Sequence, residues 1–335
     1  MRAEIPAYFI CLELSVFALF AWGFYTAVRR GRLDVMTLIA ACLVGFTVEY
    51  LFGTPIDELP GFLQALMKSG RDGSDNYYRY PQFLVMITDV PLWIVLGWAS
   101  IIHAARRTTE RLGFGLVLGS LACGLLAASI DFVLDPIAEA VGYWKWYWGA
   151  DGTGTAPPGS TAFGIPIDNF MGWMMIVAGL SFTLRLSCNW IEQWRAKLWL
   201  QIVLLTAAMF GGVAIVVVLQ SVFDKMYTAF TPQGTFMLVY GTVALLTVTR
   251  LPSLRRDAPI EPWTLAVVGF YHFYQIVMLV TQRVYVDHKV LIAFMPLMAF
   301  GSMLAFAWPS IDTILARFGA RRAHSSPDID PSPAQ

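Results

Sequence analysis

The segment LGFGLVLGSLACGLLAASIDFVL, residues 112–134, decides the fold class. Its 23 residues include one charged side chain, Asp131. At about 1.5 Å of rise per residue, a helix of this length crosses the hydrocarbon core of a bilayer, which is about 30 Å thick. The segment therefore predicts a transmembrane helix.

Eight further apolar runs meet the same criterion of length. Together with 112–134 they give nine predicted spans: 6–28, 33–54, 82–104, 112–134, 163–185, 197–221, 233–250, 261–281 and 290–310. The run 233–250 is short, so eight spans are the alternative. We expect an all-α polytopic bundle of about nine transmembrane helices. Residues 1–322 form its single transmembrane domain and residues 323–335 a disordered cytoplasmic tail.

The composition agrees with a membrane protein. Of the 335 residues, 57% are hydrophobic and 14% charged, with a mean hydropathy of +0.60, whereas a soluble domain carries roughly 25% charged residues. The 23 basic residues balance the 23 acidic ones. This excludes a nucleic-acid-binding module, a disordered chain and an ordinary soluble enzyme. The phosphate-binding, dinucleotide-binding and common hydrolase motifs are also missing from the sequence.

The basic residues predict the orientation, because cytoplasmic loops are enriched in Lys and Arg. Alternate connections carry fifteen on one side and eight on the other. The richer side holds Arg29, Arg30, Arg32, Arg106, Arg107, Arg111, Arg185, Arg195, Lys197, Arg250, Arg255, Arg256, Arg317, Arg321 and Arg322. We expect an integral protein of the bacterial inner membrane, with its N-terminus outside and its C-terminus in the cytoplasm. Two long connections, 55–81 and 135–162, then lie outside.

Acidic side chains from four predicted spans lie at a similar depth near the outer side. An ionisable residue within a span costs roughly 2.5–3.5 kcal/mol, so each one suggests a function. These residues are Glu49, Asp89, Asp131 and Asp168. Asp135 follows Asp131 by four positions, which places both on one helix face if the helix continues. The convergence of these acids predicts a functional site.

Aromatic residues accompany the acids. The connection after the fourth span contains Tyr143, Trp144, Trp146, Tyr147 and Trp148. In the fifth span, Asn169 and Trp173 share a helix face. A protonated carboxyl group can donate to an isolated double bond, and aromatic faces stabilise the cation that results. The combination therefore favours carbocation chemistry.

Simpler interpretations apply to each feature. The Asp135-Pro136 pair also fits a helix end, and Asp89 a cap or kink of its span. The aromatic cluster also fits a belt at the membrane interface. His272, three residues before Gln275, is either a buried core histidine or a proton relay or substrate contact. Asp131 and Asp135 could hold Mg²⁺ on a diphosphate, but no second aspartate pair or basic clamp lies at that depth.

Three consecutive motifs resemble the membrane carotenoid biosynthesis family. They are Asp131-Phe-Val-Leu-Asp135-Pro136, Gly142-Tyr-Trp144-Lys-Trp146 and Pro166-Ile-Asp-Asn169-Phe-Met-Gly172-Trp173. Glu49 and the stretch 91–98 are also similar to that family, so the resemblance covers roughly residues 45–175. The stretch Asn76-Tyr-Tyr-Arg-Tyr80-Pro departs from the aromatic pattern of the family. Characterised members include the 1,2-hydratases of acyclic carotenoid ends, among them hydratases of the bisanhydrobacterioruberin type.

The resemblance implies a hydratase that adds water to a terminal double bond of a linear carotenoid or other isoprenoid. Its partners are this lipophilic substrate, membrane lipid and water, and it needs neither a metal nor a redox cofactor. The expected catalytic residues are Asp131, Asp135, Glu49, Asp168 and Asp89, with Asp131 as part of the acid. The expected substrate contacts are Asn169, Trp144, Trp146, Trp173, Tyr80 and His272. Two alternatives remain: an isoprenoid cyclase that starts from the same cation, and a non-enzymatic lipid or isoprenoid carrier.

Overall fold

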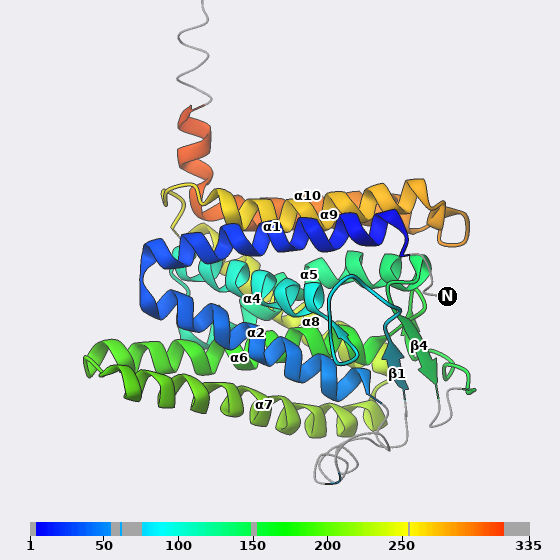
Figure 1. Cartoon of the computed structure of the whole chain (residues 1–335), viewed down its shortest axis with the longest axis horizontal. Helices are drawn as coiled ribbons and strands as arrows, with labels where there is room; N and C mark the ends of the chain where they lie inside the picture. The colour runs from blue at the N-terminus through cyan, green and yellow to red at the C-terminus, as the bar shows by residue number, and fades with distance from the viewer. Residues whose placement is uncertain (1–4, 55–60, 62–75, 149–152, 254, 318–335) are drawn as a thin grey trace, which may run out of the picture.

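The computed structural model describes residues 5–54, 61, 76–148, 153–253 and 255–317, and within them the chain forms nine α-helices. The helices run back and forth along the long axis of the molecule (Figure 1). Their bounds are α1 (Ala7–Arg30), α2 (Arg32–Gly53), α4 (Leu92–Leu112), α5 (Leu116–Val141), α6 (Ile167–Gln193), α7 (Leu198–Ala229), α8 (Pro232–Arg250), α9 (Pro262–Thr281) and α10 (Leu291–Ala307). The prediction of an all-α bundle is confirmed.

Within the described part of the chain, seven helical segments are long and apolar enough to cross a membrane. They are α1, α2, α5, α6, α7, α9 and the segment Leu291–Arg317, which contains α10. The helix α4 carries Arg106, Arg107, Glu110 and Arg111 in its last two turns. These segments indicate an integral membrane protein, with seven spans supported directly and the two remaining predicted crossings, α4 and α8, still predictions.

Short strands close one end of the bundle, which we call the strand end (Figure 1). The strands β1 (Asn76–Arg79) and β4 (Lys145–Trp148) pair antiparallel, with Tyr78 opposite Trp146. The connection before α4 and the connection after α5 are thereby joined. The predicted outer connection 55–81 falls mostly outside the described residues, and the predicted tail 323–335 falls entirely outside them.

Two tight hairpins start two of the helices in the same way. The strands β2 (Met86–Ile87) and β3 (Val90–Pro91) precede α4, and β5 (Thr161–Ala162) and β6 (Ile165–Pro166) precede α6. In each case a proline occupies the N-cap. The N–H of the first helical residue then donates back across the hairpin, from Leu92 to Val85 and from Ile167 to Ser160, both at 2.9 Å.

The first of these hairpins corrects the predicted span 82–104. The helix begins only at Leu92, because Pro91 has no N–H to donate and Thr88 has a φ of 55°, which turns the chain. Asp89 lies in this turn and is exposed, so its predicted position within a span is wrong.

The helix α5 lies at the centre of the bundle and packs against α4, α6 and α9. It continues through Pro136 to Val141 and ends at Gly142, whose φ of 83° suits a glycine. The alternative that Asp135 marks a helix end or an N-cap is therefore wrong. Asp131 and Asp135 lie on one face of a continuous helix, one turn apart.

The opposite end of the bundle gathers the basic residues, and we call it the arginine-rich end. Here Arg30 at the end of α1 pairs with Glu261, which precedes α9, and Arg106 of α4 pairs with Asp34 of α2. The backbone of Arg255 donates to Leu112 at the end of α4. The connections predicted to lie on one side of the membrane thus meet at one end of the structure.

Candidate active site

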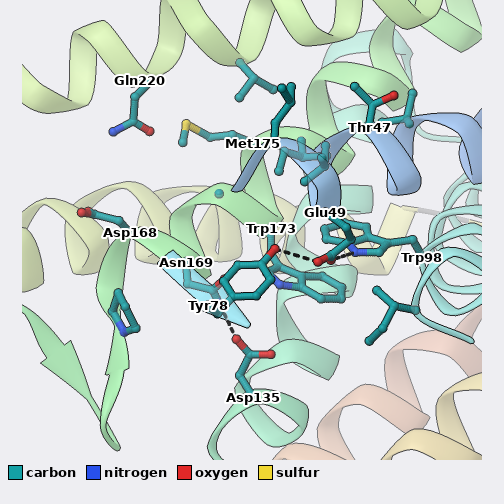
Figure 2. A pocket seen from close by; sticks show the side chains of 18 of the residues that line it. Thr47, Glu49, Tyr78, Trp98, Asp135, Asp168, Asn169, Trp173, Met175 and Gln220 are labelled. Carbon is teal, nitrogen blue, oxygen red and sulfur yellow. Dashed lines mark hydrogen bonds between the residues drawn. The ribbon is translucent and has the colours of Figure 1, made fainter. Parts of the chain in front are cut away.

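A cavity of about 530 Å³ lies toward the strand end, among α2, α4, α5, α6 and α7 (Figure 2). Most of its lining is apolar, and its carboxyl groups come from three helices: Glu49 of α2, Asp135 of α5 and Asp168 of α6. Acids that are far apart in the sequence therefore face one space.

Glu49 is buried and is held by three neutral donors. Its Oε2 accepts hydrogen bonds from the hydroxyl groups of Tyr78, at 2.7 Å, and Tyr80, and its Oε1 accepts one from the indole N–H of Trp98. Gly45 and Gly53, one turn to either side, leave room for these donors: an added Cβ would lie 2.7 Å from Cβ of Trp98 and 3.3 Å from the ring of Tyr78, respectively.

The two tyrosines are placed by the strand β1 and by the residue that follows it. Their spacing of two positions directs both side chains to the same face of an extended chain. Burial, followed by the charge of Glu49, raises the pKa of Tyr78 and of Tyr80 well above the ordinary value. Both hydroxyl groups therefore stay protonated and donate to Glu49 over the physiological range of pH.

Asp131, Asp135 and Asn169 form a second polar group. The amide of Asn169 donates to Oδ2 of Asp131, at 3.2 Å, and to Oδ2 of Asp135. One amide group therefore contacts both carboxyl groups, which places them next to each other. Two adjacent buried carboxyl groups disfavour ionisation of both, so this arrangement favours one proton held by the pair. Among the described residues, no third metal-ligating side chain joins them.

Only Asp135 of this pair faces the cavity. Asp131 is fully buried behind it and is not part of the lining, and its Oδ1 has no hydrogen-bond partner among the described residues. Figure 2 shows Asp135 directed toward Asn169 and Tyr78. Asp131, expected as part of the acid, therefore reaches the cavity through Asp135, and its catalytic role stays a prediction.

Indole rings form one wall beside Glu49. Trp98 of α4 and Trp173 of α6 stack with ring centroids 3.9 Å apart and an interplanar angle of 18°. Trp144 and Trp146 also line the cavity, and Trp144 meets Tyr80 edge to face at 6.0 Å. Electron-rich ring faces next to a carboxylate favour positive charge in this space.

The remaining predicted residues are distributed differently. Asp168 lines the cavity on the side of Gln220, away from Asp135 (Figure 2). His272 is buried in α9 and is not part of the lining, and neither of its ring nitrogens has a partner among the described residues. Asp89, in its exposed turn, is also absent from the lining. The predicted catalytic role of Asp89 and the predicted substrate contact of His272 therefore receive no support from the geometry.

Several lining residues were not predicted as site residues. Trp98 and Tyr78, which hold Glu49, belong to this group, as do Gln220 and Tyr271. The alternation of Tyr78 and Tyr80 could have indicated two side chains on one strand face. No comparable sequence pattern marks Tyr271, whose hydroxyl group lies against Gly97 of α4.

The cavity opens sideways between α2 and α7. Thr47 of α2 and Val217 of α7 both line it and are both exposed. Both helices belong to the segments that are apolar enough to span a membrane. An apolar molecule could therefore enter from the hydrocarbon region without crossing water.

The fold and the cavity define a class: helical membrane proteins with a buried, aromatic-lined cavity that contains carboxyl groups. The family described as carotenoid biosynthesis protein matches residues 76–240, just under half of the chain. The match supports a membrane carotenoid biosynthesis family, and with it a role in carotenoid biosynthesis. No curated protein and no solved structure matches it.

Proposed function

We propose that this protein is a membrane hydratase that adds water to the terminal double bond of a linear carotenoid or related isoprenoid. The observation that carries the proposal is that one cavity combines Asp135, which Asn169 links to the buried Asp131, with Glu49 and stacked indoles. The side opening toward lipid suits a substrate that is entirely apolar. Carotenoid biosynthesis, the role of the family, supplies such substrates.

The first step transfers a proton. Asp135 faces the cavity and lies beside Asp131, so it delivers a proton held by the pair to the less substituted alkene carbon. Asn169 donates to both carboxyl groups and fixes their orientation. The π electrons of the alkene form the new C–H bond, and a tertiary cation remains on the neighbouring carbon.

The second step captures the cation. The faces of Trp98 and Trp173 and the carboxylate of Glu49 stabilise the positive charge. A water molecule forms the C–O bond and loses a proton to Asp135, which restores the aspartate pair. The sum is one alkene and one water converted to one tertiary alcohol. Neither of these two reaction steps transfers electrons to or from the protein.

The test is expression in a lycopene-accumulating bacterium grown in ¹⁸O-labelled water, followed by mass analysis of the pigments. We expect a tertiary alcohol that carries the label. The variant Asp135→Asn should lose this product, whereas Asp287→Asn, at an exposed loop position, should retain it. An isomer of unchanged mass would replace the proposal by a cyclase. Unchanged lycopene beside folded protein, repeated with shorter isoprenoids, would favour the carrier.

A further inference from the structure

A second cavity, of about 580 Å³, lies at the arginine-rich end and shares no lining residue with the first cavity. Its walls come from the ends of α1, α4 and α6 and the starts of α2 and α5. Four arginines line it: Arg30, Arg106, Arg107 and Arg185.

Three of these arginines are paired with carboxylates. Arg106 contacts Asp34 and Glu110, both at 2.9 Å, Arg107 contacts Glu110 at 3.3 Å, and Arg30 contacts Asp34 at 3.4 Å. These contacts neutralise the negative charges of Asp34 and Glu110 within the cavity. The third acid of the lining, Glu192, lies on an exposed position of α6.

Arg185 is the exception. Its side chain is 7% exposed, and no carboxylate of the described residues lies within 4.0 Å of it. One terminal nitrogen donates to Thr109 and lies 4.0 Å from the sulfur of Cys123, while Nε has no partner among the described residues. A buried guanidinium without a counter-charge is costly, so an anion is needed beside it.

The start of α5 provides a second anion-binding element in the same cavity. Gly115, the N-cap, and Leu116, the first helical residue, both line it, and no side chain caps the helix. The first backbone N–H groups of a helix lack internal partners and carry partial positive charge. Gly119, one turn further along, lets Arg185 lie against α5: an added Cβ there would lie 3.0 Å from Cζ of Arg185.

We propose that this cavity binds a phosphate group, held by the guanidinium of Arg185 and the first N–H groups of α5. A planar guanidinium and a helix N-terminus are both well suited to phosphate oxygens. The phosphate belongs either to a lipid headgroup or to a free phosphate compound. Basic pockets between transmembrane helices are known to bind anionic lipid headgroups.

The test uses the full chain, purified in an uncharged detergent, and the midpoint of its thermal unfolding. Inorganic phosphate and short-chain phosphatidylglycerol are added separately, each against sodium chloride of equal ionic strength. We expect at least one of them to raise the midpoint by several degrees. Saturation by the lipid at a tenfold lower concentration assigns the site to a headgroup, and the reverse order assigns it to free phosphate. No rise with either overturns the proposal.

Matched variants locate the effect. Arg185→Gln should abolish the rise, and without added anion it should unfold at the same temperature as the native chain or higher, because it removes an uncompensated charge. Arg195→Gln, at an exposed position just beyond α6, removes the same charge outside the cavity and should keep the rise. An Arg185→Gln protein that is less stable but still responds to phosphate would show a purely structural arginine and overturn the proposal.

A third variant covers failure of Arg185→Gln to fold. Gly119→Ala retains every charge but places a methyl group where the guanidinium lies. We expect it to weaken the response to phosphate or lipid at least tenfold. An unchanged response in folded Gly119→Ala would count against the proposed position of the anion.

Discussion

Asp135 and Asp131 are identical residues on one helix face, but their positions suit them to different roles. Both carboxyl groups are buried and both accept from Asn169, but only Asp135 belongs to the cavity lining. A group that transfers a proton must reach the reacting carbon, and a group behind it can only share the proton. Position along the helix, more than residue type, therefore separates the two.

The first prediction compares the two aspartates. Asp135→Asn should lower hydration at least about 100-fold, as expected for loss of a general acid. Asp131→Asn should lower it by less than about 100-fold, because Asp135 still faces the cavity and can carry a proton itself. Rates of alcohol formation in membranes, normalised to protein, provide the measurement. A larger loss in Asp131→Asn would refute the assignment of Asp135 as the donor.

The second prediction concerns Tyr78. Its pKa is raised by burial and by Glu49 from an ordinary value of 10.0, so the folded state favours the neutral hydroxyl group. The corresponding stability is present below pH 10 and is lost as the pH rises above it, when the unfolded chain ionises. In Tyr78→Phe, stability should fall less steeply above pH 10. Unfolding midpoints between pH 8 and about 11 test this slope, with Tyr25→Phe, at a site 60% exposed, as the control.

Sequence patterns identified the carboxyl groups of this site better than its donors. Glu49 and Asp135 are conspicuous because ionisable residues are rare in apolar runs. Trp98 and Tyr78 are not, since tryptophan and tyrosine are also common at membrane interfaces. Their contact with Glu49 depends on how α2, α4 and β1 pack, which no local pattern encodes.

The two hairpins before α4 and α6 have the same structural role. Each turns the chain, ends in a proline at the N-cap and starts a helix that lines the cavity. The amino-acid sequences of the two turns differ: they are Thr88-Asp89 before α4 and Phe163-Gly164 before α6. The apolar pattern therefore predicts a third span from residue 82, ten residues before α4 begins, whereas it predicts the long uninterrupted runs of α1, α2 and α9 to within a few residues.

The third prediction addresses the contact between α5 and α6, which carry Asp135 and Asn169. An added Cβ at Gly124 of α5 would lie 3.1 Å from Cβ of Ala178 and closer still to the carbonyl oxygen of Met174. Gly124→Ala should therefore destabilise the protein by about 1–3 kcal/mol through overpacking.

The matched control for this contact is Gly241→Ala in α8. Nothing lies within 4 Å of an added Cβ at that position. A glycine-to-alanine change in an open helical site should be neutral or stabilising by up to about 1 kcal/mol. Reversible unfolding in mixed micelles measures both changes, and equal effects would contradict the proposed role of the close approach.

The whole molecule has two chemically distinct ends. Acids and aromatic rings gather at the strand end, and arginines at the other, where Glu261 lies within salt-bridge distance of Arg30, Arg107 and Arg111. The sequence predicted this segregation, because basic triplets recur in alternate connections. The assignment of the arginine-rich end to the cytoplasm stays a prediction.

The fourth prediction tests the ion network that joins α1, α4 and the start of α9. Glu261→Gln should cost about 3 kcal/mol, the lower end of the range for breaking a buried pair, because Arg30 and Arg107 are about a quarter exposed. Asp312→Asn, which breaks the exposed pair with Arg256, should cost at most about 1 kcal/mol. Unfolding free energies at low and high salt compare the two, and similar values would argue against a stabilising network.

The side opening between α2 and α7 bears on selectivity. A chain longer than the cavity can insert one end and leave the rest among the lipid tails, because the wall is open where Thr47 and Val217 lie. A closed pocket would select substrates by their total length, whereas this cavity contacts only the end that is inserted. Under the proposed function, such an enzyme distinguishes end groups and is indifferent to length, and it can treat the two ends of a symmetrical polyene as separate substrates.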